Sequence, residues 1–156
     1  MPHAEFVLSA MSAAQLPTDK RPEIAFAGRS NVGKSSLINA LLKQPGLAKT
    51  SKTPGRTQAL NFYRVWPETQ GKGHPFYLVD MPGFGYAKIN EAMRRRWERL
   101  IEDYLKTRPT LCAVIHLVDL RHPPQPLDHA MTAWFKHYEV PFLVVGTKAD
   151  KIARTK

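Results

Sequence analysis

The sequence predicts an α/β fold in which a mainly parallel sheet, with one antiparallel strand, carries helices on both of its faces. Two observations predict it. Short apolar segments typical of buried strands alternate along the chain with segments whose apolar residues recur every three or four positions, as on one face of a helix. Apart from His116, residues 111–118 are apolar without interruption, which is typical of a strand covered on both sides.

The first half of the chain contains three of the expected strands and one helix. Residues 23–27 form a short apolar run that ends in glycine, and apolar residues at helical spacing follow over 37–42. Residues 49–58 are polar and contain proline and glycine, so we expect a long loop there. The strands expected at 61–66 and 76–80 flank a hairpin connection and should pair antiparallel.

The second half repeats the alternation of helix and strand. Asn90 can cap a helix whose apolar residues keep the spacing of one buried face until Pro109 ends it. The apolar strand at 111–118 comes next, and a second helical pattern covers 127–138. Residues 141–145 are expected to form the last strand.

Length and charge bound the domain organisation and the class of partner. We expect one domain at residues 21–156 of the 156-residue chain, with residues 1–20 either a loosely held N-terminal arm or an added edge element. The 23 Lys and Arg exceed the 13 Asp and Glu, and this net charge of +10 predicts a polyanionic partner. The single cysteine, Cys112, excludes an internal disulfide and favours a cytoplasmic location. The longest apolar run, at about 111–120, is interrupted by His116 and Asp119, so no membrane span is expected, and we expect a monomer.

The segment GRSNVGKS at residues 28–35 matches the pattern G-x-x-x-x-G-K-[ST] between an expected strand and an expected helix. Its glycines let backbone N–H groups wrap a phosphate, while Lys34 neutralises the β- and γ-phosphates and the Ser35 hydroxyl binds Mg²⁺. We therefore predict a phosphate-binding loop in which Lys34 also has a catalytic role. The residues expected to bind the nucleotide here are Gly28, Arg29, Ser30, Asn31, Val32, Gly33, Lys34, Ser35 and Ser36.

Two further motifs each follow an expected strand. In D-M-P-G, the Asp80 carboxylate can reach Mg²⁺ through water and the Gly83 N–H can face a γ-phosphate. In T-K-A-D, the Asp150 carboxylate can accept two hydrogen bonds from guanine that adenine cannot supply. Alone, each motif could be an ordinary turn or helix cap; together they predict a guanine-nucleotide site. They add Asp80, Met81, Pro82, Gly83, Thr147, Lys148 and Asp150 to that site.

Over nearly its whole length the chain resembles the EngB/YihA (YsxC) family of Era-like, translation-factor-related bacterial GTPases. The segments that carry the resemblance are GRSNVGKSSLINAL, SKTPGRTQALNFY, DMPGFGYAK, LVDLRHPPQPLD and VVGTKADK. It implies a P-loop NTPase fold of the Ras-like G-domain type, Mg²⁺-dependent binding and hydrolysis of GTP, and assembly of the large ribosomal subunit. It further implies a need for the protein in normal cell division and septation. The family continues through one more strand and helix, so a C-terminally truncated G domain is expected.

The resemblance also assigns the loop at residues 49–58, before the first strand of the hairpin pair, to the first switch of a GTPase. It implies that Thr57 is a catalytic residue and a Mg²⁺ ligand beside Ser35 and Asp80, and by residue type alone Thr53 is an alternative. With Lys34, Thr57 and Gly83 complete the expected catalytic set. The same loop adds Gly55, Arg56, Thr57 and Gln58 to the residues expected to bind the nucleotide.

Hydrolysis is expected to be slow. Phe84 occupies the position at which Ras-like enzymes carry the glutamine that orients the attacking water, and an aromatic ring cannot do so. A bound partner, a monovalent cation, or both should complete the reaction. Asn31 resembles the asparagine that helps to hold K⁺ in cation-dependent relatives; alternatively, it satisfies backbone groups of its own loop.

Positive charge gathers in two regions. Residues 24–67 hold seven basic residues and no acidic one, and four arginines follow the D-M-P-G motif. These arginines form either an ion-paired helix face or, with the switches, a surface for ribosomal RNA. Apart from the GTPase switch, three interpretations stay open: another Era-like GTPase that acts on RNA or tRNA modification, a P-loop kinase or ATPase, and a basic RNA-binding protein with a vestigial pocket. The four arginines are Arg94, Arg95, Arg96 and Arg99.

Overall fold

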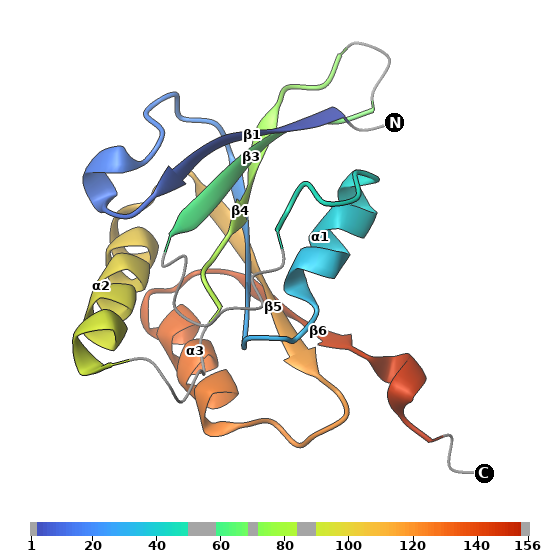
Figure 1. The fold of residues 1–156 in the computed structure, drawn as a ribbon. Helices are drawn as coiled ribbons and strands as arrows, with labels where there is room; N and C mark the ends of the chain where they lie inside the picture. Colours follow the sequence, from blue (N-terminus) through green and yellow to red (C-terminus); the bar gives the residue numbers. More distant parts are fainter. Residues whose placement is uncertain (1–2, 50–58, 69–71, 84–89, 154–156) are drawn as a thin grey trace.

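The computed structural model describes residues 3–49, 59–68, 72–83 and 90–153, which form a six-stranded sheet with helices on both faces (Figure 1). The strands lie in the order β1-β3-β4-β2-β5-β6. The elements are β1 (His3–Ala10), η1 (Ala13–Gln15), β2 (Glu23–Gly28), α1 (Lys34–Leu42), β3 (Leu60–Trp66), β4 (Phe76–Asp80), α2 (Glu91–Thr107), β5 (Leu111–Asp119), α3 (Pro126–His137), β6 (Phe142–Thr147) and η2 (Ala149–Lys151).

The pairing confirms a mainly parallel sheet with one antiparallel strand. β2 pairs in parallel with β4 and β5, and β5 pairs in parallel with β6. β3 is antiparallel to both of its neighbours, β4 and β1, so β3 is the strand that runs against the other five described strands. The expected hairpin pairing of β3 with β4 is therefore confirmed.

β1 resolves the alternatives left open for the N-terminal residues, because it is an added edge strand paired with β3 from His3↔Trp66 to Ala10↔Leu60. Its register shifts by one residue between Phe6 and Leu8, which is a β-bulge. The extra residue turns later side chains to the opposite face: Ala4 packs with the core on the α1 side, and Ala10 with the core on the α2 side.

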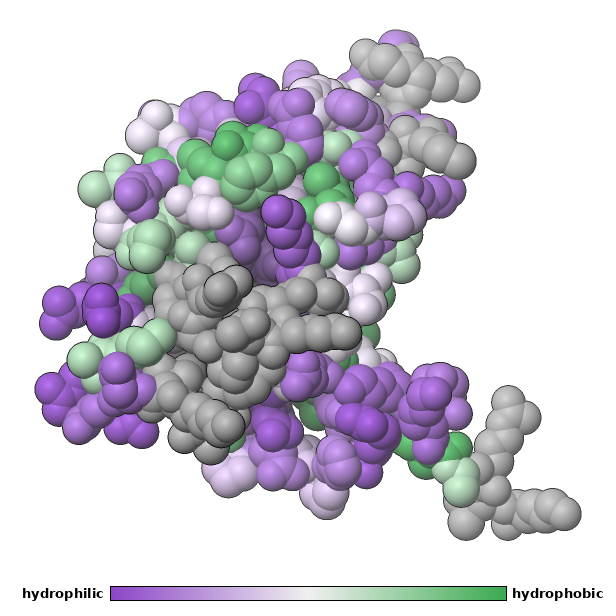
Figure 2. Space-filling view, viewed as in Figure 1, coloured by the Kyte–Doolittle hydropathy of each residue, from purple (hydrophilic) through white to green (hydrophobic). Residues whose placement is uncertain are grey.

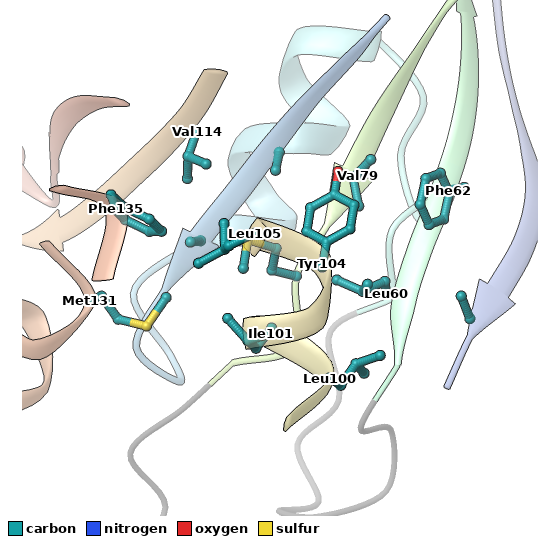
Figure 3. Packing of buried hydrophobic residues seen from close by; sticks show 14 of the residues in the cluster. Leu60, Phe62, Val79, Leu100, Ile101, Tyr104, Leu105, Val114, Met131 and Phe135 are labelled. Carbon is teal, nitrogen blue, oxygen red and sulfur yellow. The ribbon is translucent and has the colours of Figure 1, made fainter. Parts of the chain in front are cut away.

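Alternation along the central strands divides the core into two layers. On β2, Phe26 packs with the α1 layer, whereas Ala25 and Ala27 pack with the layer beneath α2 and α3. The spacing predicted for α2 is confirmed, because its apolar stripe is buried against the sheet. Figure 3 shows Tyr104 of this stripe close to Phe62, and the two rings meet edge to face at 6.4 Å. None of the described helices is long and apolar enough to cross a membrane.

Capping residues mark the starts of α2 and α3. The Asn90 side chain accepts a hydrogen bond of 2.8 Å from the Met93 N–H, as its place before α2 predicts. α3 begins with a capping box, because Gln125 accepts from the third helical residue and the Asp128 carboxylate accepts from the Gln125 N–H at 2.8 Å. Pro126 occupies the first turn of α3, where its missing N–H costs nothing.

A buried charge lies at the amino-terminal end of β2. The Glu23 side chain is fully buried and accepts hydrogen bonds from Tyr104 Oη at 2.7 Å, Arg108 Nη2 at 2.5 Å and Thr110 Oγ1 at 2.9 Å. This network joins β2 to the end of α2 and the start of β5. Since it lies at the opposite end of the strands from the three motifs, it supports the fold and not the site.

Candidate functional site

The topology brings the three motifs to one edge of the sheet. β2 lies between β4 and β5; the connection after β2 leads to β3 on one side of it, and the connection after β4 leads to β5 on the other side. In α/β sheets such a point, at the carboxyl ends of the strands, is where ligands bind. Gly28, Asp80 and Thr147 end β2, β4 and β6 and begin or precede the three motifs.

The loop between β2 and α1 has the backbone geometry that a phosphate needs. Gly33 lies directly before α1 with a φ of +99°, a left-handed conformation that other residues adopt only under strain. At Gly28, a Cβ atom would lie 2.7 Å from Val32 Cγ1, so a side chain does not fit there. The first N–H groups of α1 therefore face the loop and, with the helix dipole, form an anion site.

The second motif meets the first at Lys34. The Lys34 Nζ forms an ion pair with Asp80 Oδ1 in a place where the two side chains are only 11% and 7% exposed. Gly83 lies against the same loop, because a Cβ atom on it would be 3.2 Å from Ser30 Oγ. Burial and, to a smaller extent, the Asp80 charge raise the pKa of the nearby Tyr63 to about 12. The lysine and the carboxylate that the sequence assigns to phosphate and Mg²⁺ thus converge.

The third motif is fastened to the phosphate-binding loop by two hydrogen bonds. Thr147 Oγ1 donates to the Val32 carbonyl at 2.7 Å, and Lys148 Nζ donates to the Asn31 carbonyl at 2.5 Å. Lys148 has a φ of +60° directly after β6. Asn31 also has a positive φ, +65°, a conformation that asparagine tolerates better than most residues. The motif read as guanine-specific is therefore attached to the loop read as phosphate-binding.

Two residues that sequence reasoning did not assign to the site complete this end of it. Asp119, the last residue of β5, accepts from Arg121 Nη2 at 2.9 Å and lies 3.4 Å from Lys148 Nζ. Hydrogen bonds from Arg121, with a smaller contribution from Lys148, hold the pKa of the Asp119 carboxyl far below its usual range. The sequence feature that could have predicted Asp119 as a site residue is its position at the carboxyl end of a buried strand.

Comparison with known proteins identifies the family of this site. Residues 23–148 match the family model described as MMR_HSR1, 50S ribosome-binding GTPase. The chain is 54% identical to the GTP-binding protein EngB of Symbiobacterium thermophilum, covering 98% of this chain and 77% of that protein. The chain belongs to the EngB family. It is 50% identical to EngB of Oceanobacillus iheyensis, over 99% of this chain and 75% of that protein.

A solved structure agrees with the family. The crystal structure of a GTP-binding protein EngB superposes with a TM-score of 0.65 at 26% identity and covers 85% of this chain and 73% of that one. The fold is thus the P-loop G domain that the resemblance implied, and this EngB-family chain is a GTPase that binds GTP and GDP. The P-loop kinase or ATPase that the sequence left open is not supported.

The predicted nucleotide-binding residues differ in how exposed their side chains are. The Met81 and Val32 side chains are 1% and 3% exposed and pack into the core, so only their backbones can face a nucleotide. Asp150 has a side chain 76% exposed, with an ion pair of 3.9 Å to Lys151. Its carboxylate is thus open to a ligand. Of the other predicted residues, Gly55, Arg56, Thr57, Gln58, Thr53 and Phe84 lie outside the described residues.

The residues present fit Mg²⁺ better than a transition metal. The Ser35 hydroxyl and the Asp80 carboxylate are hard oxygen donors, and among the described residues Ser35 Oγ has a single, long hydrogen bond of 3.4 Å to the Lys49 carbonyl. Within the described ranges, no group of three or more His, Cys, Asp or Glu side chains could hold a metal ion. Mg²⁺ suits such a site because it takes few protein ligands and keeps phosphate oxygens and waters.

A buried tryptophan connects the D-M-P-G turn to α2. Trp97 Nε1 donates to the Pro82 carbonyl at 3.3 Å, next to Gly83. The Trp97 ring also stacks on Trp134 of α3, with centroids 6.1 Å apart. The spacing of α2 predicted Trp97 as a core residue, and its hydrogen bond to the turn is visible only in three dimensions. Trp97 therefore couples the position of the D-M-P-G turn to α2.

Proposed function

We propose that this EngB-family GTPase is a cytoplasmic, nucleotide-dependent switch that contacts ribosomal RNA of the large subunit or its precursor during assembly. We further propose that normal cell division and septation require it. Two things support the ribosomal partner: the matching family model is described as a 50S ribosome-binding GTPase, and the chain carries a net charge of +10. A polyanion such as ribosomal RNA is the partner that such a charge favours.

The observation that carries the proposal is a surplus of positive charge on α2. Arg95 pairs with Glu91 at 2.8 Å and Arg94 reaches Glu98 at 4.0 Å, so part of the face is the ion-paired surface expected as the alternative. Arg96 and Arg99 are exposed and have no acidic partner within the part of the chain that the structure describes. Hydrophilic side chains gather over the first turns of α2, at the lower left of Figure 2.

The site residues are assigned the following roles in binding and hydrolysis. Lys34 neutralises the β- and γ-phosphates, and the Gly83 N–H contacts the γ-phosphate. Ser35 and Asp80, with Thr57, would hold Mg²⁺, whose charge would stabilise the negative charge that develops on the phosphates. At the other end, Thr147, Lys148 and Asp150 bind the guanine.

Nucleotide state reaches α2 through the D-M-P-G turn. A contact between the γ-phosphate and Gly83 would shift the neighbouring Pro82 carbonyl, to which Trp97 donates its hydrogen bond. Because Trp97 is 7% exposed and packed in the core, that shift would be transmitted to the helix that bears the surplus arginines. The basic surface is therefore expected to bind RNA differently in the GTP and GDP states.

Co-sedimentation with large ribosomal subunits tests the proposal. The double variant Arg96→Gln/Arg99→Gln should weaken GTP-state binding and lower the dependence of log K on log salt by about 1 to 2. Arg94→Gln/Arg95→Gln, which also removes two charges but from residues paired with Glu98 and Glu91, is the matched control and should change the slope less. Binding that is insensitive to salt and to nucleotide would contradict the proposal. Preferential binding to tRNA would favour the tRNA-modification alternative.

The rate of hydrolysis is a separate part of the proposal. With Phe84 in place of a water-orienting glutamine, we propose slow intrinsic turnover that ribosomes or K⁺ accelerate, with Asn31 as the residue near the cation. Hydrolysis measured in KCl and NaCl at equal ionic strength, with and without large subunits, tests both activators. Equal rates in the two salts would reject the cation and leave Asn31 as a residue of loop geometry.

A further inference from the structure

A charged cluster joins the end of β5 and the loop after it to the lysine of the third motif, at the guanine end of the site. We call Asp119, Arg121 and Lys148 the Asp119 cluster. Asp119 Oδ1 accepts from the Arg121 backbone N–H at 2.9 Å and from Arg121 Nε at 3.1 Å, while Oδ2 accepts from Arg121 Nη2 at 2.9 Å. The Asp119 side chain is 12% exposed, so its carboxylate is held in one orientation and largely screened from water.

The cluster fixes a lysine that would otherwise be free to move. Lys148 Nζ lies 3.4 Å from Asp119 Oδ2 and 2.5 Å from the Asn31 carbonyl, so its ammonium group is held between β5 and the phosphate-binding loop. The pairing of β5 with β6 sets this up, because Asp119 is the register partner of Thr147, the residue before Lys148. The four-carbon chain of Lys148 therefore spans from the end of β6 to the loop.

We infer that Asp119 is a positioning residue for guanine-nucleotide binding, which acts by holding Lys148 against the phosphate-binding loop before the nucleotide arrives. Arg121 holds Asp119 in turn. A lysine ammonium is strongly hydrated and its side chain is rich in rotamers, so ordering it at the moment of binding would lower affinity. The inference rests on the proposed contact of Lys148 with guanine nucleotide.

The Asp119→Asn variant tests the inference with matched nucleotides. It keeps an oxygen that can accept from the Arg121 N–H but removes the charge that faces Lys148. We expect the Kd for GDP and GTP, measured by titration calorimetry, to rise about tenfold. Glu139→Gln removes the same charge from an exposed residue just before β6, at the opposite end of that strand, and should leave the Kd unchanged.

A double-mutant cycle separates positioning from a purely structural role. If Asp119 acts through Lys148, then Asp119→Asn has no further effect on the Kd in a Lys148→Met background. An additive loss in that background, or wild-type affinity in Asp119→Asn, would overturn the inference. Wild-type affinity in Lys148→Met would instead show that the proposed guanine contact of Lys148 is wrong, and the inference would fail with it.

Arg121→Ala keeps the test decisive where Asp119→Asn does not fold. Arg121 lies in the loop after β5 with a side chain 42% exposed, so its truncation leaves the core intact. The Asp119 carboxylate would keep Lys148 but lose its own support, so we expect a smaller rise in Kd, about threefold. An unchanged Kd in this folded variant would contradict the part of the inference in which Arg121 holds Asp119.

Discussion

Removing the Arg108 side chain should test how the end of the sheet opposite the nucleotide is stabilised. In Arg108→Met, the fully buried Glu23 carboxylate loses the guanidinium that donates to it at 2.5 Å and 2.8 Å. Tyr104 and Thr110 would remain as neutral donors. Breaking a buried ion pair on one side costs about 3–5 kcal/mol. For a domain of this size that corresponds to a fall in Tm of about 6–20 °C.

Urea unfolding followed by circular dichroism, together with thermal melts, measures this effect. Arg95→Met is the matched control, because Arg95 pairs with Glu91 on the surface, with side chains 73% and 66% exposed. Its cost should be about 0.5 kcal/mol or less. Adding Glu23→Gln to Arg108→Met should recover part of the loss, since no buried charge is then left unpaired. A loss in Arg108→Met no larger than in Arg95→Met would refute the reasoning.

Three further predictions concern a buried histidine, the loop and the tryptophan. Burial lowers the pKa of His116 from its ordinary 6.5, so the unfolded chain takes up the proton more readily than the folded protein. The free energy of unfolding should therefore fall as the pH drops below 6.5. Urea melts at pH 7.5 and 5.5 measure this fall, which should be smaller in His116→Gln. Gly33→Ala should raise the Kd for GDP at least about tenfold, since it distorts the anion site, whereas Gly46→Ala, equally strained at a φ of +77° but outside the site, should not. Trp97→Phe removes the indole donor from the buried Pro82 carbonyl and should lower the free energy of unfolding by about 1–3 kcal/mol; a smaller loss would mean that this hydrogen bond contributes little.

Local patterns in the sequence predicted the central strands, the three helices and the meeting of the motifs. Burial on two faces makes a strand continuously apolar, as in β5, and a capping residue such as Asn90 marks the start of a helix. β1 was left open because its bulge after Phe6 breaks the alternation on which strand prediction depends. The rule that ligands bind at the carboxyl ends of parallel strands is enough to predict that Lys34 and Asp80 lie at one site.

The residues that sequence reasoning missed act over long separations in the chain. Glu23 and Arg108 are 85 residues apart, and each looks like an ordinary surface charge until the fold buries them together. Asp119 reads as a strand-ending aspartate, and only the pairing of β5 with β6 places it beside Lys148. The Trp97 side chain was predicted as core from its helical spacing, but that spacing says nothing about the carbonyl it meets.

The central claim, that this EngB-family chain selects guanine nucleotides through Asp150, is tested most directly by competition among GTP, ATP and XTP. The wild-type protein should prefer GTP to ATP and XTP by at least about 100-fold, because a site built to accept hydrogen bonds from guanine leaves polar groups unpaired with the other bases. In Asp150→Asn, the preference should move from GTP toward XTP. Equal binding of GTP and ATP by the wild type, or an undiminished preference for GTP in the variant, would contradict the account.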